Sequence, residues 1–213
     1  MRRPRELPSA TYDRSDQGTR VVPALKMEDL RQALRRQVFS ETGMNVYTVL
    51  DGASVPDLVP RLYQLEPEHA CLYSGELAPD MAEVAPYLVQ LQPRTEFSDW
   101  VLEQGWGHHW GILAHSYSGL KAVRHHFRGF LKVHDNKGQP LLFRYYDPRV
   151  MRDYLPTCNA EELEKIFGPV ETYLVEGENM NVLLRFQQAA GSLKAQGVTL
   201  AEAVAVDGQM RRL

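Results

Sequence analysis

Apolar positions along the chain follow two patterns, short continuous runs and helical spacing. Runs rich in branched and aromatic residues predict strands at 46–50, 70–73, 87–91, 106–114, 130–134, 141–146 and 172–175. Helical spacing or capping residues predict helices at 27–39, 54–65, 95–104, 118–127, 149–155 and 159–168. Strands interleaved with helices predict an α/β fold, with a mixed sheet of short strands and helices packed on it.

One pair of apolar runs is separated by typical turn residues. The segment Asp135-Asn136-Lys137-Gly138 lies between the runs 130–134 and 141–146. Such residues favour a tight reversal between antiparallel strands. We therefore expect one β-hairpin near residues 130–146.

The most strongly patterned stretch is 141–150, where an apolar run ends in two tyrosines and meets Asp147 and Pro148. The Asp147 carboxylate can accept the free amide hydrogens of a helix start. Pro148 suits the first helical position, which needs no amide donor. This stretch predicts a strand through residue 146, an abrupt cap, and a short helix at 149–155.

At this corner we expect Arg144, Asp147 and Arg149 to gather. One interpretation is structural, in which a cap, a turn and an Arg–Asp pair brace the chain. The other is a recognition site, because corners at the ends of strands in α/β sheets often bind ligands and partners.

Composition narrows the classes of function. The chain has 213 residues, a net charge of −3 and a pI near 6.2, which argues against a general nucleic-acid or membrane-surface binder. No apolar run approaches the length of a bilayer span. The basic residues 1–5 are not followed by the apolar segment of a secretory signal. These features predict a cytoplasmic protein with no nucleic-acid and no membrane partner.

We expect the chain to have three parts. Residues 1–26 are rich in Arg, Pro, Ser and Asp without an apolar period, and we expect a flexible arm. Residues 27–176 form the main α/β domain, and 177–213 form a C-terminal extension. Within that extension, 180–187 fits either a strand or a helix, and the remainder fits either a small helical piece or a loose tail.

The candidate chemistry is sparse. His108 and His109 are neighbours, so on a strand they would point to opposite faces. His125 and His126 lie on a predicted helix without a His, Asp or Glu four residues away to complete a zinc pair. Phosphate-binding and dinucleotide-binding fingerprints are missing from the sequence. We expect no catalytic residues, no metal and no cofactor.

Several short motifs occur in a specific order. They are Leu50-Asp51-Gly52-Ala53, Cys71-Leu72-Tyr73-Ser74-Gly75-Glu76, Ala85-Pro86-Tyr87-Leu88-Val89-Gln90-Leu91, Gly105-Trp106-Gly107, Phe143-Arg144-Tyr145-Tyr146-Asp147-Pro148-Arg149-Val150 and Phe167-Gly168-Pro169-Val170. The set resembles the bacterial domain-of-unknown-function family whose members act as type VI secretion effector chaperones, also called adaptors. The resemblance covers about residues 44–176.

This resemblance implies a non-enzymatic role in the cytoplasm. Such adaptors bind an effector toxin, typically through its N-terminal or spike-tip region, and help load it onto the VgrG spike protein, which they contact only transiently. Aromatic and arginine side chains are frequent hot spots of protein interfaces. Candidate partner-binding residues are therefore Trp106, Arg144, Tyr145, Tyr146, Asp147 and Arg149.

Two other interpretations remain open from the sequence. One is an enzyme, a hydrolase or transferase, whose cleft is built around His108, His109, Arg144 and Asp147. It predicts that these side chains converge on one pocket with perturbed pKa values. The other is a structural component of the secretion machine, which would assemble stably with the spike.

Overall fold

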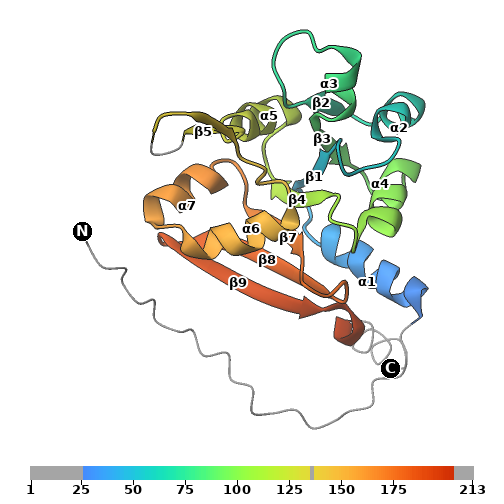
Figure 1. The fold of residues 1–213 in the computed structure, drawn as a ribbon. Helices are drawn as coiled ribbons and strands as arrows, with labels where there is room; N and C mark the ends of the chain where they lie inside the picture. The colour runs from blue at the N-terminus through green and yellow to red at the C-terminus, as the bar shows by residue number, and fades with distance from the viewer. Residues whose placement is uncertain (1–25, 135–136, 204–213) are drawn as a thin grey trace, which may run out of the picture.

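A seven-stranded sheet forms the centre of the computed structural model, which describes residues 26–134 and 137–203 (Figure 1). Its strand order is β2-β3-β1-β4-β7-β8-β9, and neighbouring strands run antiparallel. The strands are β1 (Asn45–Asp51), β2 (His69–Cys71), β3 (Pro86–Leu91), β4 (Gly111–Ser116), β7 (Thr172–Glu176), β8 (Val182–Ala189) and β9 (Ser192–Thr199).

Helices cover both faces of the sheet and confirm the predicted α/β class. One face packs against α1 (Met27–Val38), α2 (Leu58–Leu65) and α4 (Glu96–Trp100), which continues as the π-helical turn η1 (Val101–Gly105). The other face packs against α5 (Leu120–Arg128), α6 (Pro148–Tyr154), the 3-10 turn η2 (Leu155–Thr157) and α7 (Ala160–Phe167). The short α3 (Pro79–Glu83) follows β2. In the described part of the chain, every helix is too short or too polar to cross a bilayer.

The two hydrophobic cores explain why the central strands have continuous apolar runs. In β1, Val46 and Leu50 face one core, whereas Tyr47 and Val49 face the other. A strand that is buried on both faces has no polar side to alternate with its apolar side.

The predicted hairpin is confirmed, but its second strand is shorter than expected. β5 (Lys132–His134) and β6 (Pro140–Leu142) pair antiparallel as a separate two-stranded sheet. The predicted strand extended to Tyr146, whereas Tyr145 and Tyr146 turn away and are buried in the core beneath α6. Burial of two aromatic rings outweighs the few ladder hydrogen bonds that a longer two-stranded ribbon would gain. Residues 135–136 of the predicted turn lie outside the described residues.

The C-terminal part of the described chain extends the main sheet. β8 resolves the choice between strand and helix in favour of a strand. Residues 192–199, which were expected to form a helical piece or a loose tail, form β9, and helical structure begins only at residues 200–203. β9 is an edge strand with mostly exposed side chains, so its sequence has little apolar alternation. The predicted arm 1–26, except for Lys26, and residues 204–213 lie outside the described residues. The proposed division into three parts remains a prediction.

Helix starts were predicted with mixed success. Asn159 forms a full capping box with Glu162, with hydrogen bonds of 3.0 and 2.8 Å, as its spacing predicts. The similar spacing of Ser54 and Asp57 was misleading. Asp57 precedes α2 in a left-handed conformation without a side-chain cap, and Ser54 instead binds Asp51.

Gly111 begins β4 where the neighbouring strand β1 passes very close. A Cβ atom at Gly111 would lie 2.0 Å from the carbonyl oxygen of Val49. We expect Gly111→Ala to lower the free energy of unfolding by about 2 kcal/mol or more, because the central strands must separate. Urea denaturation measures the loss. Gly197→Ala in β9 is the matched control, since its Cβ would meet only ordinary contacts of 3.9 Å or more; equal effects would contradict this assignment.

Candidate functional site

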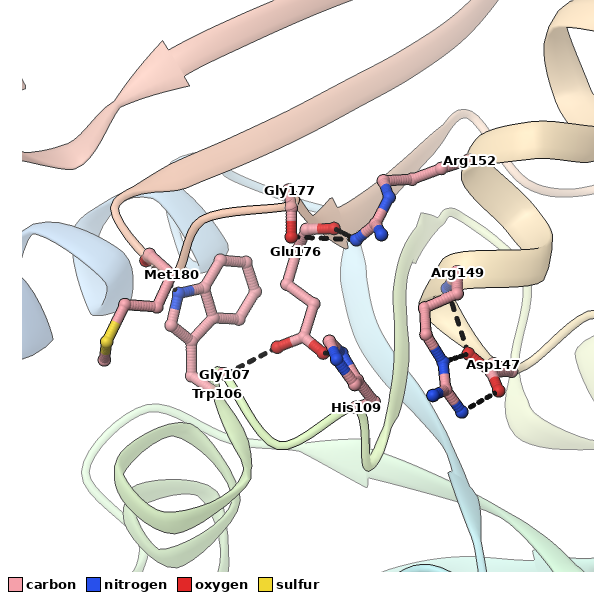
Figure 2. A network of polar contacts seen from close by, with 9 residues as sticks. All are labelled: Trp106, Gly107, His109, Asp147, Arg149, Arg152, Glu176, Gly177 and Met180. Carbon is pink, nitrogen blue, oxygen red and sulfur yellow. Dashed lines mark hydrogen bonds and ion pairs between the residues drawn. The ribbon is translucent and has the colours of Figure 1, made fainter.

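The corner before α6 has the cap that the sequence predicts. Asp147 Oδ1 accepts a hydrogen bond of 2.9 Å from the Arg149 backbone amide, and Pro148 occupies the first helical position. The Arg149 guanidinium folds back onto the same carboxylate, with Nε 3.0 Å from Oδ1 and Nη2 2.7 Å from Oδ2 (Figure 2). The carboxylate therefore caps the helix and holds an exposed guanidinium in place.

The pKa of Asp147 reflects competing effects. Burial raises this pKa, but the hydrogen bonds from Arg149 and the positive charges of Arg149 and Arg144 outweigh it. The pKa of the Asp147 carboxyl therefore lies below its ordinary value, and the group is ionised at neutral pH. Such a group is poorly suited to act as a general acid.

Arg144 lies near this corner, but its ion-pair partner is a different carboxylate. Its Nη2 donates to Asp51 at the end of β1. Asp51 is only 2% exposed and also accepts hydrogen bonds from Ser54 Oγ at 2.8 Å and from the Ala53 amide at 3.2 Å. The Arg144 guanidinium carbon lies 6.0 Å from the centre of the Tyr146 ring. Arg144 thus ties the corner to the end of the central sheet.

The two tyrosines of the corner lie beneath the surface. Tyr145 and Tyr146 are each 2% exposed. Tyr145 stacks on Phe127 with ring centres 5.6 Å apart and donates its hydroxyl to the Phe127 carbonyl oxygen at 3.0 Å. Burial raises the pKa of both phenols. At this corner the side chains that reach solvent are mainly those of Arg144 and Arg149, 44% and 58% exposed.

A second buried carboxylate, Glu176, ends β7. Its side chain accepts hydrogen bonds from the Gly107 amide and from His109 Nδ1 (Figure 2). Arg152 of α6 donates through Nη1 to the carbonyl oxygens of Glu176 and Gly177, both at 2.8 Å. These contacts connect the end of β7 to the turn before β4 and to α6.

Trp106 belongs to that turn and is also largely buried. Its indole Nε1 donates to the Met180 carbonyl oxygen at 2.6 Å. Gly107 has a φ of +85°, which favours glycine, and a Cβ at Gly105 would lie 2.7 Å from the Trp110 ring. The Gly-Trp-Gly motif therefore has a structural explanation in a tight turn.

The prediction that His108 and His109 lie on a strand was wrong. Both belong to the turn that precedes β4, and His109 has a φ of +59°. The reason is the tight turn around Gly107, whose amide is held by Glu176. His109 faces Glu176, whereas His108 is exposed.

The polar groups of the alternative cleft are distributed over separate pairs. His109 contacts Glu176, Arg144 contacts Asp51, and Asp147 contacts Arg149. Within residues 26–134 and 137–203, no three His, Cys, Asp or Glu side chains are grouped as a metal site would require. This arrangement can brace the end of the sheet and present two fixed guanidinium groups to carboxylates of a partner.

Sequence reasoning missed three residues of this network, Asp51, Glu176 and Arg152. Asp51 and Glu176 directly follow buried apolar runs. A carboxylate at the end of such a run was the signal in the sequence that could have identified both residues. Arg152 gave no signal, because its backbone partners lie 24 and 25 residues away in the sequence.

The chain matches a known protein family. The sequence model of the family described as Domain of unknown function (DUF4123) matches residues 46–165. The match spans more than half of the chain, from β1 into α7, so the chain belongs to this family. It includes both partners of the Arg144–Asp51 and Arg149–Asp147 pairs. No curated protein matches the chain significantly. No solved structure does so either.

Asp147→Asn tests the electrostatic part of the corner, since Asn can also cap a helix. Because the folded-state pKa of Asp147 is lowered, its charge stabilises the fold above the unfolded pKa of about 4, and this contribution is lost as the pH falls through the folded value. We expect the wild type to be more stable than the variant at neutral pH, and the difference to shrink on acidification. Denaturation at several pH values measures it; a difference that grows in acid would contradict the lowered pKa.

Arg144→Ala leaves the buried Asp51 carboxylate without its guanidinium. We expect a loss of about 2 kcal/mol in the free energy of unfolding, because an uncompensated buried charge is costly. Arg149→Ala is the comparison: the more solvated Asp147 keeps the backbone amide of residue 149, so the loss should be smaller. Urea denaturation of both variants at neutral pH checks the order, which would be reversed or absent if Arg144 were not a brace.

Proposed function

We propose that this protein is a non-enzymatic adaptor that binds a type VI secretion effector in the cytoplasm of the producing cell and helps load it onto the VgrG spike. The observation that carries the proposal is membership of the domain-of-unknown-function family over residues 46–165. The ordered motifs of the sequence, which resemble those of effector adaptors, give the family match this functional meaning.

The fixed positions of the polar side chains at the corner and in the turn before β4 support a binding role. Arg144 and Asp147 each form an ion pair inside the protein, and His109 is hydrogen-bonded to the Glu176 side chain. Side chains that are held in this way contribute to a rigid surface, and a rigid surface loses less conformational entropy when a partner binds. The proposal requires no cofactor and no metal.

Arg144 and Arg149 are the residues through which the corner would contact the effector. Each is well exposed, and each is oriented by a carboxylate. A guanidinium with donors still accessible to solvent can bind carboxylates or carbonyl oxygens of a partner. Tyr145, Tyr146 and Trp106 would act from beneath, by supporting the surface.

Loading requires a complex that forms in the producing cell and then releases its effector. The adaptor would cover apolar surface of the effector, which otherwise aggregates, until the spike takes its place. Contact with VgrG would be transient. Moderate affinity, set by a few hot-spot residues, suits such a transfer.

Co-expression tests the proposal. The tagged full-length chain is expressed together with the genes encoded beside it, and the eluted proteins are identified by mass spectrometry. We expect one large effector to co-purify in a defined stoichiometry and to be soluble only when the adaptor is present, with VgrG retained weakly. The control is the same effector expressed without the adaptor.

Two results would contradict the proposal. One is a folded adaptor that elutes alone while the effector is equally soluble without it. The other is a permanent complex with VgrG that forms in the absence of any effector, which would favour a structural component of the secretion machine.

A further inference from the structure

An open groove of about 400 Å³ lies between the β5–β6 hairpin, the end of α5, α3 and the segment after β2. These elements neighbour one another on the side of the molecule away from α1 (Figure 1). Most of the lining is apolar: Leu72, Tyr73, Leu77, Met81, Leu131 and Leu142. The volume suits a few apolar side chains of a partner rather than a whole folded domain.

The walls of the groove are exposed, whereas its floor belongs to the core. Leu72 and Leu131 are 1% and 5% exposed, but Met81 and Leu142 are 45% and 49% exposed. Leu141 and Val133 are also exposed, but they pair with each other on the opposite face of the hairpin and do not line the groove. Exposed apolar side chains such as Met81 and Leu142 that line a groove over core residues typically mark an interaction site.

The hairpin itself points to the same conclusion. In the described part of the chain, β5 and β6 form a sheet of only two strands, apart from the central sheet. A two-stranded ribbon is marginally stable in water unless its apolar side chains are covered. A partner that fills the groove would cover Leu142 and stabilise the hairpin.

The charges at the groove indicate the chemistry of the occupant. Arg128 and Lys132 are the charged residues of its lining, and both are basic. Arg128 donates to Ser74 Oγ across the groove, which orients its guanidinium. Asp80 and Glu83 belong to α3 but not to the lining. A groove with an apolar floor and two basic side chains is complementary to a partner segment that carries apolar residues and a carboxylate.

From this geometry we infer that the groove binds a short segment of the effector that presents apolar side chains with an acidic residue beside them. The inference rests on the proposed adaptor function and adds the place and the chemistry of recognition. Apolar contacts on Met81 and Leu142 supply affinity, and Arg128 with Lys132 selects for the carboxylate. Neither Arg144 nor Arg149 belongs to the lining of the groove, so variants of the groove and of the corner can be compared.

The apolar part is tested by Met81→Ser combined with Leu142→Ser in the full chain. Both side chains are about half exposed, so the fold should tolerate the change. We expect the amount of effector that co-purifies with the tagged chain after co-expression, measured by quantitative mass spectrometry, to fall about tenfold or more. The matched control is Met27→Ser on α1, which alters a methionine of similar exposure, 48%, away from the groove.

The electrostatic part is tested by Lys132→Glu, with Lys194→Glu on the exposed edge strand β9 as the control for net charge. We expect Lys132→Glu to weaken effector binding several-fold at low salt and less at high salt, because added ions screen the repulsion. The control should bind as the wild type does. Circular dichroism and thermal unfolding confirm that each variant is folded.

The outcomes distinguish a failure of the groove inference from a failure of the proposed adaptor function. Weaker binding by both groove variants, with unchanged controls, supports the inference. Groove variants that bind the effector as well as the wild type does would overturn the inference but leave the adaptor function standing. A wild-type chain that binds no effector would overturn the adaptor function and the inference together.

Discussion

The burial of Asp51 is the constraint on which the end of the sheet depends. A carboxylate that is 2% exposed must be compensated, and the protein does so with the Arg144 guanidinium, the Ser54 hydroxyl and the Ala53 amide. Because Arg144 belongs to the loop between β6 and α6, this compensation holds that loop against the last residue of β1. The same loop then buries Tyr145 and Tyr146 and begins α6 at the Asp147 cap. This ion pair and the burial of the two tyrosines together hold the most distinctive motif of the sequence in place.

Glu176 plays a corresponding part at the end of β7. Through the Gly107 amide and His109 it holds the turn that leads into β4, and Arg152 connects the same strand end to α6. The two carboxylates thus anchor two motifs of the family-like set, the Gly-Trp-Gly turn and the Asp-Pro corner. These motifs have structural roles in the scaffold, because their Asp, Arg and His side chains hold strand ends and turns together.

The surfaces suited to a partner lie around this scaffold. The corner presents the Arg144 and Arg149 guanidinium groups, each held by a carboxylate. The groove beside the β5–β6 hairpin has a mostly apolar lining and two basic residues, Arg128 and Lys132. The adaptor function that we propose requires binding an effector and later releasing it, and several modest contacts suit that task better than one deeply buried interface. The exposed leucines of the hairpin carry a cost in water, which is consistent with a surface that functions when it is covered.

The sequence by itself determined the local structure and the class of fold. Continuous apolar runs predicted the central strands, the 3.6-residue spacing predicted α1, and the caps at Asp147 and Asn159 were recognisable because their partners lie two or three residues away. Only the tertiary structure decided the site. It paired Arg144 with Asp51, 93 residues apart, turned Tyr145 and Tyr146 into the core, and placed His109 against Glu176. It also made β9 a strand, which its weak pattern did not predict. The physical reason is the range of the interactions: caps and periodicity act within one or two turns of chain, whereas compensation of a buried charge depends on which distant segments the folded cores bring together.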